Sequence, residues 1–284
     1  HHAQVIWYGE RTTGLYGAII GDIVGSRFEG RGKQIKTKDF ELFAPDSRFT
    51  DDTVMTVAIA DGLLHCLHYY RDFDNIPGAF AVAMKRWGQK YPHAGYGKKF
   101  SEWIFSKHPQ PYNSFGNGAA MKVSAIAWSY DLLWHVELAT DYITALTHNH
   151  PEGIKGAQAV ASAIFLARKC STKEKIKNYI EKNFEYDLSR SLDDIRQTYQ
   201  FEISCQKTVP EAIIAFLEST DFEDAIRNAV SLGGDSDTLA AITGSIAEAY
   251  YGVPEKLIKK CKKYLPKDIL EVVDKFHVEM KKFI

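Results

Sequence analysis

The chain has 284 residues, of which 45% are apolar and 25% are charged, and its formal net charge is -1. These values are typical of a globular protein with a large core, and they exclude a strongly basic chain that binds nucleic acid through its overall charge. No uninterrupted apolar run approaches the roughly 20 residues that a membrane-spanning helix requires. We therefore expect neither a membrane nor a nucleic-acid partner.

The four cysteines are scattered and form no Cys-x-x-Cys pair, which is typical of reduced thiols in a cytoplasmic protein; they are Cys66, Cys170, Cys205 and Cys261. We expect a cytoplasmic protein, and we expect a monomer. The leading His1-His2 pair is typical of an expression-tag remnant. We therefore assign residues 1–10 to such a leader. No break in composition marks a linker in the rest of the chain, so we assign residues 11–284 to a single domain.

Apolar residues repeat at steps of three and four in several stretches, including residues 157–165 and 239–249. This period is typical of helices, and sustained two-residue alternation of the strand type is hard to find. The nine prolines lie between periodic segments or within their first turns, where a missing N–H group is tolerated. The pattern predicts an all-α chain of about a dozen helices, given typical helix lengths.

The first acidic candidate is Glu29, which lies in the stretch GDIVGSRFEG at residues 21–30. It follows a predicted helix rich in small residues, and close packing of that helix would bring the next loop near the core. The alternative, a solvated glutamate on a loop, is the interpretation that the residues alone favour.

The next candidate is the sequence TDDT at residues 50–53, which opens a predicted helix. Two consecutive carboxylates on a helix point about 100° apart, so Asp51 and Asp52 suit one or two cations. Thr50 adds a hydroxyl oxygen. The alternative is that Thr50 is an ordinary N-cap with acids in the first turn, where the helix dipole favours them.

Two further motifs suit a ligand. SFGNGAAM at residues 114–121 predicts a glycine-rich loop leading into a helix, where exposed N–H groups bind anions such as phosphate. Such glycine turns are also commonly structural. THNHP at residues 147–151 places two histidines before another helix, and we expect them to hydrogen-bond a ligand, because carboxylates are available for metal.

The segments that follow differ in polarity. Thr172 and the lysines after it predict the start of a polar helix, because threonine is a common N-cap. The region from about 185 to 207 is polar and less periodic, and we interpret it as an excursion on the surface.

The second acidic cluster, GGDSDT at residues 233–238, opens the last strongly periodic helix. The glycines permit a tight turn that brings Asp235, Asp237 and Thr238 together. An EF-hand calcium loop requires glycine at its sixth position, which is Ala240 here, so that interpretation fails. Carboxylates this dense repel one another without a cation, and they predict a site for magnesium, manganese or calcium. A capped helix start is the alternative.

In this order, five motifs resemble those of the ADP-ribosylglycohydrolase family, and the resemblance runs from about Gly14 to Gly252: GDIVGSRFEG, FTDDTVM, SFGNGAAM, THNHPEG and SLGGDSDTLAAITG. It implies a compact, single-domain orthogonal helical bundle. It also implies a hydrolase that cleaves the N- or O-glycosidic bond between ADP-ribose and its carrier. The expected partner is therefore an ADP-ribosylated protein or a small ADP-ribose conjugate.

The resemblance also implies a set of site residues. Two Mg²⁺ or Mn²⁺ ions would be held by Thr50, Asp51, Asp52, Asp235, Asp237 and Thr238. Catalytic roles would fall to Glu29, Asp52 and Asp237, with the activation of water left open between Glu29 and a metal-bridging acid. The ADP-ribose would contact Ser114, Phe115, Gly116, Asn117, Gly118 and His148, with the diphosphate on the glycine loop.

The implied chemistry agrees with these residue types. Vicinal ribose hydroxyls are good ligands for hard cations, and carboxylates stabilise an oxocarbenium-like state at the anomeric carbon. One departure is Lys122, which stands where many family members have arginine after the Ala-Met of the glycine loop. Lysine keeps the charge but loses the two-pronged hydrogen-bonding fork.

The residues also bear on three other classes of protein. A prenyl-diphosphate enzyme requires a third acid in its Asp-Asp-x-x-Asp motif, but Met55 stands at that position, and the His-Asp dipeptide of some helical phosphohydrolases is absent. A member of the family that only binds ADP-ribose, or serves a structural role like the related lens crystallins, would have eroded metal ligands. The atom that joins ADP-ribose to its carrier is left open by the residues at 91–97 and after 185.

Overall fold

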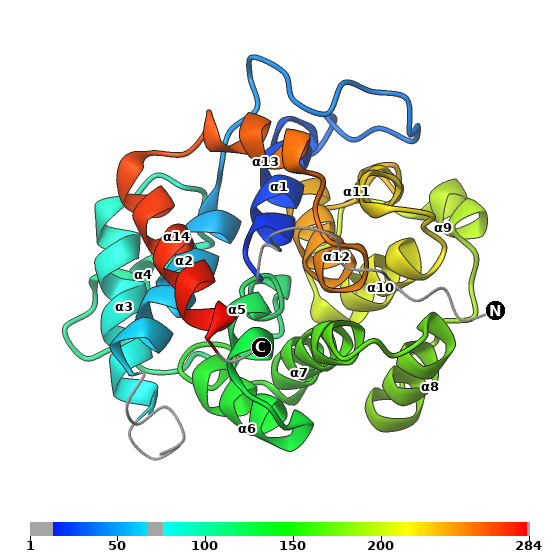
Figure 1. Ribbon diagram of the computed structural model, residues 1–284. Helices are drawn as coiled ribbons and strands as arrows, with labels where there is room; N and C mark the ends of the chain where they lie inside the picture. The colour runs from blue at the N-terminus through cyan, green and yellow to red at the C-terminus, as the bar shows by residue number, and fades with distance from the viewer. Residues whose placement is uncertain (1–13, 67–75, 283–284) are drawn as a thin grey trace.

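The computed structural model describes residues 14–66 and 76–282, and it confirms the predicted all-α fold (Figure 1). The described part contains no β-strand and only one isolated β-bridge, between Gly116 and Ser204. Its α-helices are α1 (Tyr16–Gly25), α2 (Asp51–His65), α3 (Ile76–Lys90), α4 (Lys98–Phe105), α5 (Ser124–Ser129), α6 (Leu133–Thr144), α7 (Pro151–Arg168), α8 (Lys173–Phe184), α9 (Leu192–Thr198), α10 (Val209–Leu217), α11 (Phe222–Val230), α12 (Ser236–Tyr251), α13 (Glu255–Lys262) and α14 (Lys267–Lys281). The predicted leader at 1–10 lies outside the described residues.

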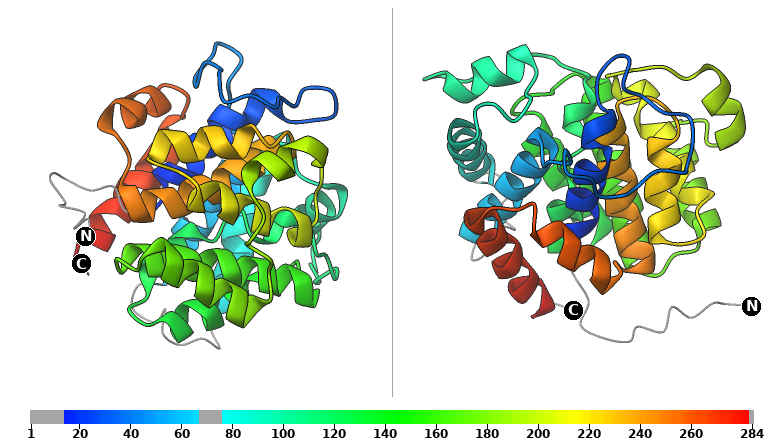
Figure 2. Two further views of the ribbon diagram at one scale, coloured as in Figure 1. Left: turned by 90° about the vertical axis from the view of Figure 1, so that its right-hand side faces the viewer. Right: turned by 90° about the horizontal axis from the view of Figure 1, so that it is seen from above.

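Two helices from opposite ends of the chain, α1 and α12, lie side by side at the centre of the molecule (Figures 1 and 2). They approach backbone to backbone because glycines face the contact. A Cβ atom at Gly21 would lie 2.0 Å from the carbonyl oxygen of Ala240, and one at Gly17 would lie 2.1 Å from that of Gly244. The small residues of the first predicted helix therefore bring the N-terminal loop and Glu29 to the core, as expected.

The predicted helix starts are also confirmed. The side chain of Thr50 accepts a hydrogen bond from the N–H of Asp52 at the start of α2, and Thr172 accepts one from Lys175 at the start of α8. His150 acts in the same way before α7, where its Nδ1 accepts from the N–H of Glu152 at 3.0 Å. His150 is thus a helix cap that is occupied within the protein.

The segment from 185 to 207 is only partly the surface excursion that its polarity indicates. It contains α9 and is fixed to the core by buried apolar side chains; these are Tyr186, Leu188, Leu192 and Ile195. Its end returns to the glycine loop, where the N–H of Asn117 donates to the carbonyl of Ile203 at 2.7 Å. These buried residues could not be predicted from the sequence, because they do not repeat at a helical period.

The described part of the chain has no helix that combines the length and apolar character needed to cross a bilayer.

Candidate metal centre and ligand pocket

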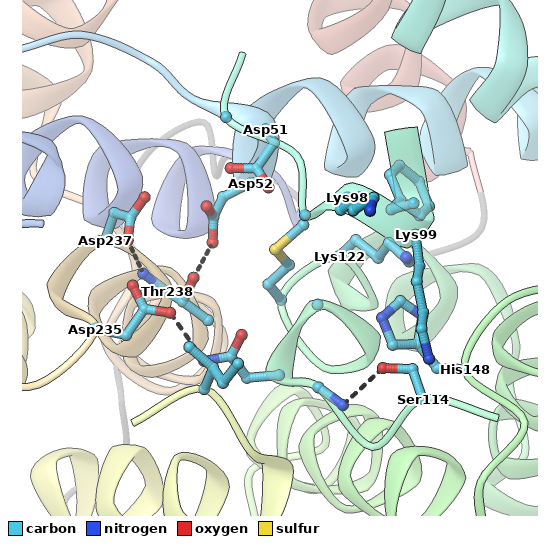
Figure 3. Close-up of a pocket in the computed structure, with 18 of the residues that line it drawn as sticks. Asp51, Asp52, Lys98, Lys99, Ser114, Lys122, His148, Asp235, Asp237 and Thr238 are labelled. Carbon is cyan, nitrogen blue, oxygen red and sulfur yellow. Dashed lines mark hydrogen bonds between the residues drawn. The ribbon is translucent and has the colours of Figure 1, made fainter. Parts of the chain in front are cut away.

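Both acidic motifs lie at helix N-termini that face each other. Asp51 and Asp52 begin α2, whereas Asp235 and Asp237 lie at the start of α12 (Figure 3). Gly233, with φ of +74°, makes the turn before Asp235 in a conformation that glycine adopts without strain. The positive ends of two helix dipoles thus meet where the carboxylates gather.

The carboxylates are packed closely enough to share a cation. One oxygen from each of Asp22, Asp52 and Asp237 lies within 4.8 Å of the others, and the same holds for Glu29, Asp235 and Asp237. Asp237 belongs to both groups. The arrangement therefore offers two adjacent sets of hard oxygen ligands that share one residue, which suits a divalent ion such as Mg²⁺ or Mn²⁺.

The hydroxyl of Thr50 lies among three carboxylates and has a single proton to share with them. Its Oγ1 lies 2.6 Å from Asp22, 3.0 Å from Asp52 and 3.1 Å from Asp237. A hydroxyl has one proton to donate, so at most one of the three contacts can be a hydrogen bond to an ionised carboxylate. The other contacts are stable only if a cation or additional protons lie among the oxygens.

Burial raises the pKa values of the acids in the cluster. It raises the pKa of Asp51 and Asp237 well above the ordinary value, and nearby carboxylates add to the effect. The pKa of Asp52 is raised by burial in the same direction. Burial also raises the pKa of Asp235 to about 6. The protein therefore holds these acids in a state that a bound cation would relieve.

Asp22 is a participant that the sequence did not reveal. Its Oδ2 accepts from the N–H of Thr50 at 2.7 Å and from the hydroxyl of Thr53 at 2.6 Å, and its Oδ1 accepts from the Thr50 hydroxyl. With its oxygens occupied in this way, Asp22 anchors the start of α2 from α1. The available signal was that Asp22 is the only charged residue between Tyr16 and Gly25.

Thr238 and Asn117 complete the support of the acids. The hydroxyl of Thr238 donates to Asp52 at 2.8 Å, which joins the two helix N-termini. The side-chain amide of Asn117 donates to Asp235 at 2.9 Å and to the hydroxyl of Thr208 at 3.2 Å. The Asn117 side chain thus lies against the acidic cluster, although its motif predicts a phosphate contact.

Glu29 lies on the loop that follows α1 and is half-buried at the edge of the cluster. Burial raises its pKa, and the charges of Asp235 and Asp52 add to this effect. The interpretation as a solvated loop glutamate is therefore wrong. Glu29 is the C-cap of a short 3₁₀ turn, Ser26–Phe28, whose Ser26 carbonyl accepts a hydrogen bond from the Glu29 N–H. In contrast to Asp52 and Asp237, it lies outside the α-helices.

A cavity of about 440 Å³ opens from the acids toward the surface. Both segments to which the sequence assigned no function line the cavity: Gly95 and Gly97 come from the first, and Phe201 and Ile203 come from the second. Other lining residues that sequence reasoning missed are Lys98, Lys99, Phe100 and Tyr112. Lys98, Lys99 and Phe100 are consecutive at the start of α4, and the fold brings Tyr112 to the same cavity.

The glycine loop forms another part of the wall. Ser114, Gly116, Asn117 and Gly118 line the cavity, but the exposed side chain of Phe115 lies outside it with its ring edge against His150. The N–H of Gly116 donates to the Ser114 hydroxyl at 3.0 Å, so that amide is engaged within the loop. The loop leads into a short 3₁₀ turn, Asn117–Ala119, before α5 begins.

His148 lines the cavity opposite the acids (Figure 3). Its Nδ1 lies 2.7 Å from the hydroxyl of Thr147. Burial and the nearby Lys122 charge lower its pKa well below the ordinary value, so the ring is neutral at physiological pH. A neutral imidazole can present either a donor or an acceptor to a ligand.

Comparison with known proteins agrees with this geometry. The family model for ADP-ribosylglycohydrolase matches residues 9–282. ADP-ribosylhydrolase ARH3 from Bos taurus is 28% identical, covering 90% of this chain and 89% of that protein, and the Homo sapiens protein is 28% identical with 90% of each covered. The ADP-ribosylarginine hydrolase Tri1 of Pseudomonas putida is 26% identical over 84% of this chain and 70% of its own.

A solved structure, described as an ADP-ribosylglycohydrolase-related protein complex, has the same fold. It superposes with a TM-score of 0.67 at 22% identity, and the match covers 93% of this chain and 96% of that one.

Proposed function

This chain belongs to the ADP-ribosylglycohydrolase family and is a glycosidic-bond hydrolase, and from that premise we propose that it removes ADP-ribose from a protein side chain or a small conjugate through a binuclear magnesium centre. The observation that carries the proposal is the Thr50 hydroxyl, which meets carboxylate oxygens of Asp22, Asp52 and Asp237 with a single proton. A fold retained for structure alone would gain nothing from this arrangement.

The donor set fits two hard divalent cations. The resemblance assigns their protein ligands to Thr50, Asp51, Asp52, Asp235, Asp237 and Thr238, and we keep that assignment as a proposal. Asp52, Asp235 and Asp237 belong to the two groups of acids that share Asp237, whereas Asp51 belongs to neither group. When bound, two such cations would neutralise the acids and supply Lewis acidity toward ribose hydroxyls and water. Asp22 and Asn117 would fix the orientation of the ligands, as second partners of metal ligands commonly do.

The protein groups then divide the work on the substrate. Hydrolysis joins a water oxygen to the anomeric carbon of the ribose and breaks the bond from that carbon to the carrier, which leaves with a proton. Glu29 is our candidate for taking the proton of water, because its raised pKa suits a general base and it lines the cavity beside Asp235 and Asp237. Buried carboxylates nearby would stabilise positive charge at the anomeric carbon.

The opposite end of the cavity suits the rest of ADP-ribose. The volume of about 440 Å³ is within the range of small-molecule pockets. The hydroxyl of Ser114 accepts from the Gly116 amide and still has its own proton to donate to a ligand. The neutral ring of His148 offers a hydrogen bond without a competing charge. These groups would orient the nucleotide part while the ribose faces the acids.

The test is to offer arginine-linked, serine-linked and acetyl-linked ADP-ribose to the protein and to measure release of ADP-ribose with and without Mg²⁺. We expect magnesium-dependent cleavage of at least one linkage. The Asp52→Ala and Asp237→Ala variants should lose this turnover while their circular dichroism remains helical. Full release by either variant in the presence of a chelator would refute the metal-dependent mechanism.

A further inference from the structure

The loop between α1 and α2 has residues of the acidic cluster near both of its ends and is fastened to other helices in its middle. Glu29 lies at its start, and Thr50 lies at its end. The middle of the loop passes α11, where Lys38 forms an ion pair with Asp224 (Figures 1 and 2). A second lysine of the loop makes contacts of a different kind.

The ammonium of Lys36 joins the ends of two helices. Its Nζ donates to the carbonyl of Tyr199, the C-cap of α9, at 2.5 Å. It also donates at 2.7 Å to the carbonyl of Leu232, which follows the C-cap of α11. An ammonium has three protons and serves both acceptors at once, and the negative ends of helix dipoles favour a cation there. Lys36 therefore fixes the ends of α9 and α11 relative to the loop.

The same contacts enclose the glycine turn that leads into α12. A Cβ atom at Gly233 would lie 2.7 Å from Cε of Lys36, and one at Gly234 would lie 2.4 Å from Cε1 of Tyr199. The stem of the lysine and the ring of the tyrosine thus lie directly against the two glycines. The residue after the turn is Asp235, the N-cap of α12.

The turn is weakly held by its own backbone. The amides of Leu232 and Gly233 donate to the carbonyls of Ala229 and Val230 at 3.3 Å each, beyond the usual limit of about 3.2 Å. Asn117 orients the side chain of Asp235, but it acts beyond the turn. The path of the backbone before Asp235 therefore depends on the contacts that Lys36 and Tyr199 make from outside.

We propose that Lys36 is a positioning residue, which holds the Gly233-Gly234 turn so that Asp235 and Asp237 face the cation site. Lys36 does not line the cavity, so it acts through the backbone of the turn. The cation rests on the proposed function, whereas the support of the turn requires no metal.

Three variants separate this role from simple fastening of the loop. Lys36→Met keeps an apolar stem against Gly233 and removes the ammonium. Lys38→Met is the matched control, because it removes the ion pair with Asp224 from the same loop and leaves the contacts of Lys36 in place. Lys36→Arg keeps the charge and can donate to both carbonyls.

The first measurement is amide hydrogen exchange of the metal-free protein, read by mass spectrometry on peptides that cover residues 232–239. We expect exchange there to be about 10-fold faster in Lys36→Met, because two hydrogen bonds from a charged donor no longer oppose local opening. Lys38→Met should match the wild type in these peptides, and Lys36→Arg should keep most of the protection.

The second measurement is the affinity for Mn²⁺, with the free ion followed by electron paramagnetic resonance. Loss of an outer partner of metal ligands commonly weakens metal binding, and we expect about a 10-fold loss in Lys36→Met. Lys38→Met should keep wild-type affinity, and Lys36→Arg should restore most of it. A general loosening of the loop would instead weaken both methionine variants alike.

Wild-type exchange of residues 232–239 in Lys36→Met, or equal losses in Lys36→Met and Lys38→Met, would overturn the positioning role. If the wild type bound no Mn²⁺ while the exchange results held, the support of the turn would stand and the proposed metal centre would fail. If the wild type bound Mn²⁺ and Lys36→Met bound it equally well, the metal centre would stand and the positioning role would fail.

Discussion

Neutralising one acid of the cluster should stabilise the metal-free protein. Burial raises the pKa of Asp235 from 3.8 to about 6, and its side chain is almost fully buried. A carboxyl whose pKa is higher in the folded than in the unfolded protein destabilises the fold at high pH. The loss begins when the pH rises above the pKa in the unfolded chain and is complete above the pKa in the folded protein. Because one pKa unit corresponds to about 1.36 kcal/mol, this rise in the pKa of Asp235 lowers the free energy of unfolding by at most about 3 kcal/mol at pH 7.5.

Asp235→Asn removes this penalty with little change in shape. The carbonyl oxygen of the new amide can still accept the hydrogen bond from Asn117, which is 2.9 Å long in the wild type. We expect metal-free Asp235→Asn to unfold at higher urea than the wild type at pH 7.5, by up to about 3 kcal/mol, and this gain should vanish as the pH falls to about 4. Circular dichroism of the helices follows the transition.

With magnesium present, the wild type should be more stable than Asp235→Asn. The wild type gains stability from a bound cation, whereas the variant lacks one ligand charge and gains less. Asp46→Asn, at an exposed position in the loop before α2, controls for the loss of one negative charge and should change little. If Asp235→Asn were less stable than the wild type at pH 7.5, or if magnesium stabilised both equally, the inferred role of the acids would be wrong.

Two other substitutions test the surroundings of the acids. Asn117→Ala should lower Mg²⁺ affinity in calorimetry by about 10- to 100-fold, because the amide that orients Asp235 is lost; unchanged Mg²⁺ affinity with weaker ADP-ribose binding would assign Asn117 to the diphosphate instead. Gly21→Ala should cost about 3 kcal/mol or more in urea unfolding, because its Cβ would meet the Ala240 carbonyl at 2.0 Å. The control Gly78→Ala, which meets no atom within 4 Å, should stay within about 1 kcal/mol of the wild type.

The helical fold and the helix starts were predictable because local rules determine them. Period and capping residues identify α2 from Thr50 and α8 from Thr172, and both helices begin there. The segment after residue 185 was less predictable, because its apolar anchors are single residues in a polar stretch. Burial of this kind is decided by neighbouring elements, which local periodicity does not report.

The candidate site also combines features that the sequence predicts with features that depend on packing. Acids clustered in two motifs indicate a cation from their chemistry alone, and the fold brings the motifs together. The directions of individual side chains were not predictable: the amide of Asn117 donates to Asp235, although its motif predicts a phosphate contact. Asp22 was also not interpretable from its motif, because its role depends on which partners surround it after packing.

The contact of α1 with α12 has a consequence for biosynthesis. The hydroxyl of Thr50 and the carboxylate of Asp237, which meet at 3.1 Å, are 187 positions apart in the chain. At about 5–20 residues per second, a ribosome needs roughly ten to forty seconds to synthesise the second after the first. During that interval the N-terminal helix exposes its row of glycines without the helix that covers it. A nascent chain therefore cannot complete the cluster of acids before α12 has been made and has folded against α1, and cation uptake would report that stage of synthesis.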